Sequence, residues 1–143
     1  MKIQQLSIFI ENKPGHIGKA VKVLGDSGIN LVTLSLADTE QYGILRIVVK
    51  DWERARDLLA AAGFMVKVTD VLAIEVKDRP GGLQEILEAV EAAKLNIEYM
   101  YAFTAHRDNA AILLFRFADT EAAVKALEGN PAVSLVNRVE LFK

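Results

Sequence analysis

Residues 11–31 read ENKPGHIGKAVKVLGDSGINL, and residues 77–97 read KDRPGGLQEILEAVEAAKLNI. Both stretches contain a polar turn, a Pro-Gly pair, a run of apolar residues at helical spacing and a late asparagine. The same sequence separation lies between Pro14 and Pro80 and between Asn30 and Asn96. An internal match of this length predicts that the chain is built from two similar units.

A second match extends the repeat toward the C-terminus. Residues 44–59, ILRIVVKDWERARDLL, correspond to residues 112–127, ILLFRFADTEAAVKAL, at a slightly longer offset. The extra residues fall in TAHRDNA (104–110), which we interpret as a hairpin loop, because loops tolerate insertions best. The repeat therefore predicts two domains, 1–70 and 71–143, and the absence of a Gly/Ser-rich linker indicates that they are docked.

The apolar spacing predicts the same order of elements in each unit. In the first unit we expect strands at 5–11, 30–38, 44–50 and 64–70, with a hairpin turn at 39–43. One helix ends near Gly28, and the second begins after Asp51 and ends at Gly63. In the second unit we expect helices from Leu83 and after Asp119, and strands at 72–77, 97–105, 111–118 and 133–142.

This order, strand-helix-strand-strand-helix-strand, predicts the fold class. It is the α+β, ferredoxin-like βαββαβ plan, in which an antiparallel four-stranded sheet carries both helices on one face. Two such units can pair side by side or pack face to face, and the sequence leaves both arrangements open. Because small units leave sheet edges and faces bare, we expect further pairing into a homodimer.

Composition excludes several classes of function. The 143 residues carry a net charge of −2, which provides no basic field for nucleic acid or an anionic membrane. No cysteine is present, so thiolate catalysis and Cys-ligated zinc are excluded. The N-terminus lacks the apolar core of a signal peptide, and no apolar run is long enough to span a membrane. We therefore expect a cytoplasmic protein with no bound metal or cofactor.

The repeated turn has two interpretations that its spacing leaves open. It can be a simple strand-to-helix turn, for which Pro-Gly is common. It can also be a binding site, because the first turn of a helix presents unpaired N–H groups and a positive dipole end to an anion. Asn12 adds a donor and an acceptor, a combination that suits a zwitterion.

The pattern of both stretches resembles the first half of ACT domains, which are small regulatory modules that bind amino acids. The resemblance covers nearly the whole chain as two tandem units. It implies a non-catalytic protein whose ligand lies at an interface between two units. In that family the ligand is held by the loop after the first strand and by the start of the second strand.

The resemblance also implies which residues form the site. In the first unit the corresponding residues are the polar loop residue, the Pro-Gly pair, the helix start and the asparagine before the second strand: Asn12, Pro14, Gly15, His16, Ile17 and Asn30. In the second unit they are Asp78, Gly81, Gly82, Leu83 and Asn96. Asp78 replaces Asn12, and a carboxylate there repels a ligand carboxylate. The two sites can therefore be unequal, and we favour the first.

Other functions fit the residues less well. Arg79 and Asn96 superficially match the Arg and Asn of small enzymes that hydrolyse acyl phosphates, but no general base accompanies them. RNA-recognition modules share the topology, but the central strands lack their aromatic signature. We expect a regulatory protein that binds an amino acid and signals to a metabolic enzyme or pathway. The alternative is a ligand-independent subunit of an amino-acid biosynthetic enzyme.

Overall fold

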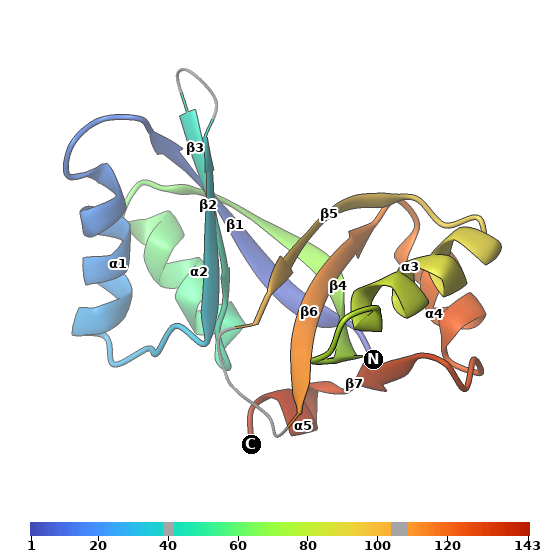
Figure 1. Ribbon diagram of the computed structural model, residues 1–143. Helices are drawn as coiled ribbons and strands as arrows, with labels where there is room; N and C mark the ends of the chain where they lie inside the picture. The colour runs from blue at the N-terminus through green and yellow to red at the C-terminus, as the bar shows by residue number, and fades with distance from the viewer. Residues whose placement is uncertain (39–41, 104–108) are drawn as a thin grey trace. The chain divides into compact units, whose positions relative to one another are not determined.

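The computed structural model describes residues 1–38, 42–103 and 109–143, and places twelve elements along them (Figure 1). The parts of the predicted hairpin loops at 39–41 and 104–108 lie outside the described residues. In chain order the elements are β1 (Ile3–Glu11), α1 (His16–Asp26), β2 (Thr33–Asp38), β3 (Tyr42–Val48), α2 (Trp52–Ala61), β4 (Met65–Lys77), α3 (Gly82–Ala92), β5 (Ile97–Ala102), β6 (Ala110–Phe117), α4 (Thr120–Leu127), β7 (Ser134–Val136) and α5 (Arg138–Leu141).

The chain divides into two compact units. The first unit is Gln4–Thr69, and the second is Asp70–Lys143 together with Met1–Ile3. Strands of the first unit pair in the order β2-β3-β1-β4, and strands of the second in the order β7-β4-β6-β5. Each unit thus has the βαββαβ order, which confirms the predicted α+β class with two ferredoxin-like units.

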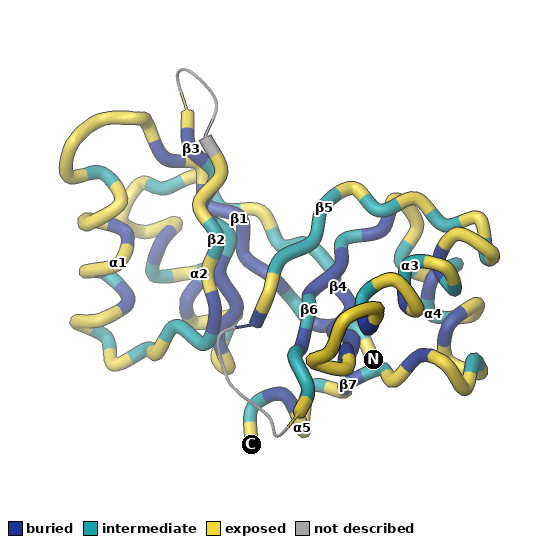
Figure 2. Tube along the Cα trace, in the orientation of Figure 1, coloured by how far each residue is buried: buried dark blue, intermediate teal, exposed yellow. Residues whose placement is uncertain are grey.

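The core of the first unit lies between its sheet and α1 and α2. Leu6, Ile8 and Ile10 alternate along β1 toward the helices, because neighbouring strand residues point to opposite faces. They pack against Ala20 and Leu24 of α1 and against Ala55 and Leu59 of α2. Figure 2 shows the buried positions along these strands and on the inner turns of the helices. Both helices therefore cover one face, as the ferredoxin-like plan requires.

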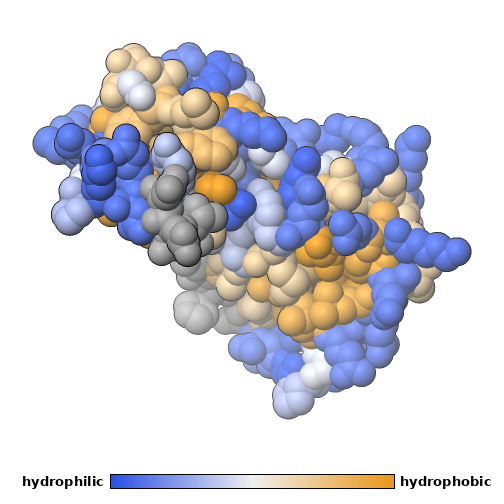
Figure 3. Space-filling view, turned by 90° about the horizontal axis from the view of Figure 1, so that it is seen from above, coloured by the Kyte–Doolittle hydropathy of each residue, from blue (hydrophilic) through white to orange (hydrophobic). Residues whose placement is uncertain are grey.

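The second unit repeats this arrangement with larger side chains. Phe115 and Phe117 of β6 are fully buried, and their rings stack with centroids 5.8 Å apart. Around them lie residues of β4, α3 and α4, including Ile74, Val90 and Leu127. Figure 3 shows that polar and apolar side chains are both exposed on the face of the molecule seen from above. Among the described residues, no helix has the length and apolar content needed to cross a membrane.

Two strands differ from the sequence-based expectation. The predicted strands 64–70 and 72–77 form one continuous strand, β4. The predicted strand 133–142 is wrong over most of its length, because β7 contains only Ser134–Val136 and the chain then turns into α5. Asn137 causes the turn, since its side-chain oxygen accepts a hydrogen bond from the Glu140 N–H at 2.9 Å. An asparagine cap of this kind starts a helix.

The predicted helix ends agree with the structure. Gly28 has φ +72°, and the N–H of Ile29 donates to the Leu24 carbonyl at 2.9 Å, which closes α1 with a left-handed residue. Lys94 occupies the matching place after α3, with φ +56°, and the Leu95 N–H donates to the Val90 carbonyl at 3.2 Å. A lysine is therefore held in a conformation that favours glycine.

Replacing Lys94 with glycine is expected to raise the free energy of unfolding by about 0.5–1 kcal/mol. Glycine removes the strain of the left-handed conformation, and the greater entropy that it gives the unfolded chain offsets only part of this stabilisation. The opposite change, Gly28→Lys, is the control and is expected to lower stability by a similar amount. Urea titration followed by circular dichroism measures both. Destabilisation by Lys94→Gly would contradict this explanation.

Candidate functional site

The first Pro-Gly turn connects β1 to α1 through Asn12, Lys13, Pro14 and Gly15. Two backbone hydrogen bonds hold it: the Lys13 N–H donates to the Glu11 carbonyl at 2.8 Å, and the His16 N–H donates to the Lys13 carbonyl at 3.3 Å. Gly15 has φ +87°, a left-handed conformation that glycine adopts without strain. The turn therefore leads directly into α1, and one of the first N–H groups of α1, that of His16, is already paired with the turn.

The next amide groups of α1 remain available. Among the residues that the structure describes, no protein acceptor is found for the N–H groups of Ile17 and Gly18, whereas the Lys19 N–H donates to Gly15. The first turn of α1 contains no acidic residue, and His16 and Lys19 lie in or beside it. Since the N-terminal end of a helix carries partial positive charge, this end of α1 favours an anionic group.

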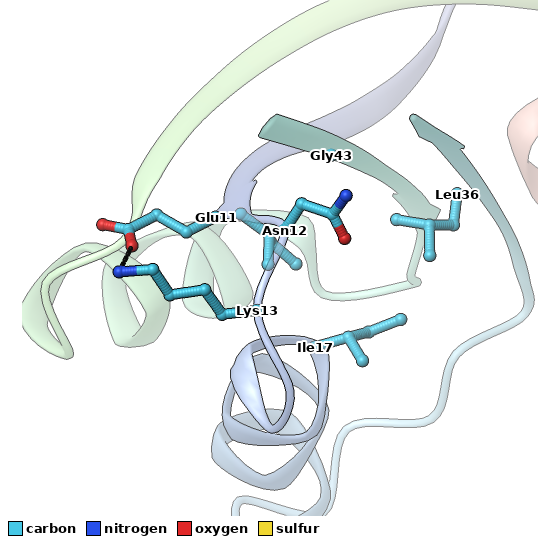
Figure 4. Close-up of a pocket in the computed structure, with 7 residues that line it drawn as sticks. Glu11, Asn12, Lys13, Ile17, Leu36 and Gly43 are labelled. Carbon is cyan, nitrogen blue, oxygen red and sulfur yellow. Dashed lines mark ion pairs between the residues drawn. The ribbon is translucent and has the colours of Figure 1, made fainter. Parts of the chain in front are cut away.

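A pocket of about 170 Å³ lies beside this turn (Figure 4). It is bounded by the end of β1, the start of α1, the edge strand β2 and β3, and its lining residues are Ile10, Glu11, Asn12, Lys13, Ile17, Leu36 and Gly43. The side chain of Asn12 points toward Leu36, and Ile17 lies below them on α1. The pocket therefore combines one carboxamide with apolar side chains from separate elements.

Glu11 and Lys13 form an ion pair on the outside of this pocket. The Lys13 Nζ lies 2.9 Å from a Glu11 carboxylate oxygen, and both side chains extend away from Asn12 and Leu36 (Figure 4). The hydrogen bond from Lys13, with the attraction of its charge, lowers the pKa of the Glu11 carboxyl. The same hydrogen bond and charge raise the pKa of the Lys13 ammonium. Because both groups are exposed, the pair adds little stability.

The pair gives a pH-dependent prediction. The pKa of Glu11 is lowered in the folded state, so the pair is intact above the ordinary carboxyl range and is lost as pH falls through the lowered pKa of Glu11. Carbon-detected NMR titration of the Glu11 carboxyl measures this pKa. In the Lys13→Gln variant we expect the Glu11 pKa to move up toward its ordinary value. An identical titration in both proteins would contradict the ion pair.

The second Pro-Gly turn has the same backbone hydrogen bonds but less space. The Arg79 N–H donates to Lys77 at 2.9 Å, and the Gly82 N–H donates to Arg79 at 3.0 Å. A Cβ added at Gly82 would lie 2.0 Å from the Lys77 carbonyl oxygen. The carbonyl at the end of β4 thus contacts the first turn of α3 directly. The matching residue of the first turn, His16, has a Cβ, so the first turn must be more open there.

The two turns also differ in the charges that they carry. An Arg79 Nη2 donates to the Glu85 carboxylate at 2.7 Å, so the basic residue of the second turn is paired with an acid in the first turn of α3. Lys19 occupies the place of Glu85 in the first unit, and Asp78 occupies the place of Asn12. The second turn therefore carries its own carboxylates where the first turn has neutral and basic groups.

The predicted site residues divide between these two turns. Asn12 and Ile17 line the pocket, and Pro14, Gly15 and His16 form the turn beside it. Asn30 is exposed between α1 and β2 and does not line this pocket. The residues predicted in the second unit lie at its turn and before β5: Asp78, Gly81, Gly82, Leu83 and Asn96. Their role in binding stays a prediction.

Sequence reasoning missed five of the described residues that line the pocket, namely Ile10, Glu11, Lys13, Leu36 and Gly43. Glu11 and Lys13 adjoin Asn12 in sequence and could have been included on that ground. Gly43 reaches the pocket because it pairs with Ile10 across β1 and β3. His106, in the predicted hairpin loop, lies outside the described residues. Within the described part of the chain, no group of three or more His, Asp or Glu side chains could hold a metal ion.

The fold and the site together define a tandem of two ferredoxin-like units with a small polar and apolar pocket at one strand-to-helix turn. Residues 1–141 match the family model of the ACT domain pair. The chain therefore belongs to the ACT domain pair family, which confirms the resemblance found in the sequence.

Two solved structures are similar to this chain. A crystal structure of a protein from Bacteroides thetaiotaomicron is 35% identical to this chain, has a TM-score of 0.91, and matches 100% of this chain and 97% of that one. The regulatory subunit of aspartate kinase from Thermus thermophilus, in its ligand-free form, has a TM-score of 0.64 at 18% identity. The match covers 90% of this chain and 92% of that subunit, and at this identity it shows the fold alone.

Curated relatives are longer than this chain. The acetolactate synthase small subunit of Buchnera aphidicola is 27% identical over 88 residues, which cover 61% of this chain and 55% of that subunit. The large subunit of replication factor C from Pyrobaculum aerophilum is 28% identical over 130 residues, which cover 85% of this chain and 31% of that subunit. The chain thus spans between about a third and about half of the curated relatives it matches.

Proposed function

We propose that the protein is a non-catalytic regulatory module that binds an amino acid at an interface between ACT units and signals to a metabolic enzyme or pathway. The pocket beside Asn12 is the observation that carries this proposal. The N–H groups at the start of α1 would hold the ligand carboxylate, and the oxygen of the Asn12 carboxamide would accept a hydrogen bond from the ligand ammonium.

The exposure of the pocket supports a site completed by a second unit. Leu36 and Ile17 are 53% and 38% exposed, although both are large apolar side chains that line the pocket. A ligand here would keep one side open to solvent on this unit alone, whereas small-molecule sites bury most of their ligand. A homodimer in which another unit covers this side would close the site.

Regulation follows if the ligand favours one arrangement of the units. A ligand that contacts two units binds best when they are correctly placed, and it shifts the population toward that arrangement by its difference in affinity. A partner that recognises only this arrangement then responds to the ligand. The similarity to the acetolactate synthase small subunit supports a metabolic enzyme as the partner, and a cytoplasmic location stays a prediction.

The second turn has a structural role in this proposal. Its basic residue, Arg79, is paired with Glu85, and the Lys77 carbonyl fills the space in front of Gly82. A ligand carboxylate would meet Asp78 and Glu85 there and be repelled. The chain is therefore proposed to bind one amino acid through its first unit, with residues of the second turn forming a scaffold.

A thermal-shift screen of the twenty amino acids tests binding. An amino acid present at about 100 times its Kd should stabilise the protein by about 2.7 kcal/mol, which is a shift of several degrees for a chain of this size. A response to none of them would favour the alternative function, a ligand-independent subunit. Co-purification of an enzyme with the full chain would then support that alternative.

Asn12→Ala is expected to weaken binding of the amino acid found in that screen by about tenfold or more, because a carboxamide that bonds the charged head group of the ligand is lost. Asp78→Ala, the same position in the second turn, is the matched control and should leave the affinity unchanged. Calorimetric titration measures both. Equal loss in the two variants, or none in Asn12→Ala, would place the site elsewhere. Asn30→Ala tests whether the site extends to the start of β2.

A further inference from the structure

The ligand class follows from the side chains that face the pocket, if the proposed function holds. We propose that the first unit is selective for an amino acid with a small, neutral aliphatic side chain. The proposal concerns the part of the pocket formed by Ile10, Ile17, Leu36 and Gly43, which we call the apolar end.

The apolar end is assembled from four elements. Ile10 of β1 is buried, Ile17 comes from α1, and Leu36 comes from the edge strand β2. Gly43 of β3 lies beneath Leu36, since a Cβ added at Gly43 would be 3.3 Å from Leu36 Cδ1. Glycine inside a strand often marks a place where another group approaches closely. Here it leaves room that a ligand side chain can share with Leu36.

Among the lining residues whose side chains the structure describes, none directs a charged group into the apolar end. The charged lining residues are Glu11 and Lys13, which are paired with each other and extend away from Asn12 and Leu36 (Figure 4). A ligand with an acidic or basic side chain would place a charge beside Ile17 and Leu36, and the described lining residues offer it no unpaired counter-charge, which is unfavourable. The described lining residues therefore favour an apolar ligand side chain over a charged one.

The size of the pocket limits the ligand further. Its volume is about 170 Å³. A cavity of about 150 Å³ holds a single benzene ring, so an aromatic side chain would occupy nearly all of the part of the site that this unit forms. A side chain of a few carbons fits together with its head group.

Equilibrium dialysis of the full-length protein against each of the twenty amino acids tests this proposal. We expect alanine, valine, leucine or isoleucine to bind more tightly than every charged or aromatic amino acid. Tighter binding of a charged, polar or aromatic amino acid would overturn the inference and leave the proposed function intact. Binding of no amino acid would overturn both.

Two variants test whether Leu36 and Gly43 determine which amino acid binds. Leu36→Ala is expected to weaken binding of the preferred amino acid by about tenfold or more, because the ligand side chain loses its apolar contact with Leu36. Leu34→Ala is the matched control, since Leu34 lies on the same strand and is 47% exposed but does not line the pocket. Gly43→Ala should weaken binding of leucine more than binding of alanine, because the added methyl group occupies space at the apolar end and lies 3.3 Å from Leu36 Cδ1. Unchanged affinities in both Leu36→Ala and Gly43→Ala would overturn the inference.

Discussion

Gly82→Ala is expected to lower the free energy of unfolding by about 3 kcal/mol, at the upper end of the effects of overpacking. The added Cβ would lie 2.0 Å from the Lys77 carbonyl oxygen, a contact with backbone that no side-chain rotation can relieve. Either α3 must move away from the end of β4, or the hydrogen bonds of the turn must break. Urea titration followed by circular dichroism measures the change.

His16→Ala provides the matched control for this result. His16 occupies the same place in the first turn, and its change to alanine removes atoms without adding any near the backbone. We expect its effect to stay within about 0.5 kcal/mol, as for most partly exposed surface positions. A similar, small effect of both substitutions would show that the second turn is as open as the first, and would contradict its assignment as a scaffold.

Phe115→Ala is expected to destabilise the protein by about 3–5 kcal/mol, the range for a buried phenylalanine that leaves a cavity. Phe115 is fully buried, pairs with Leu72 across β4 and β6, and stacks on Phe117. Its loss therefore removes contacts on several sides at once, in the centre of the second core.

Phe9→Ala is the control for the second core. Phe9 also lies within a strand but is 36% exposed, so the same truncation should lower stability by about 1 kcal/mol or less. Thermal or urea unfolding of both variants measures the difference. A loss at Phe115 no larger than that at Phe9 would contradict the position of the second core.

Local patterns in the sequence were sufficient to predict most of the fold. The alternation of Leu6, Ile8 and Ile10 predicts which face of β1 is buried, and Gly28 predicts the end of α1, because both effects depend on near neighbours. The C-terminal segment differs from the predicted strand for a local reason. Asn137 followed by Glu140 is a helix-start pattern, and it interrupts residues whose composition favours a strand.

The candidate site could be predicted only in part. Asn12 and Ile17 belong to the continuous turn, so the sequence brings them to the same place. Leu36 and Gly43 reach the pocket through the register of β2, β3 and β1, which a single sequence does not specify. The pairing of Gly82 with His16 in the repeat is visible in the sequence, but the close contact that makes Gly82 necessary depends on how α3 packs against β4.

The central claim is that the first unit holds a free amino acid beside the start of α1. Amide NMR spectra of the isotopically labelled full chain, recorded with and without a mixture of the twenty amino acids, test it most directly. We expect the largest shifts at residues 12–18 and at Leu36 and Gly43, with the second turn little changed. Shifts confined to residues 78–83, or no shifts at residues 12–18, would contradict the claim.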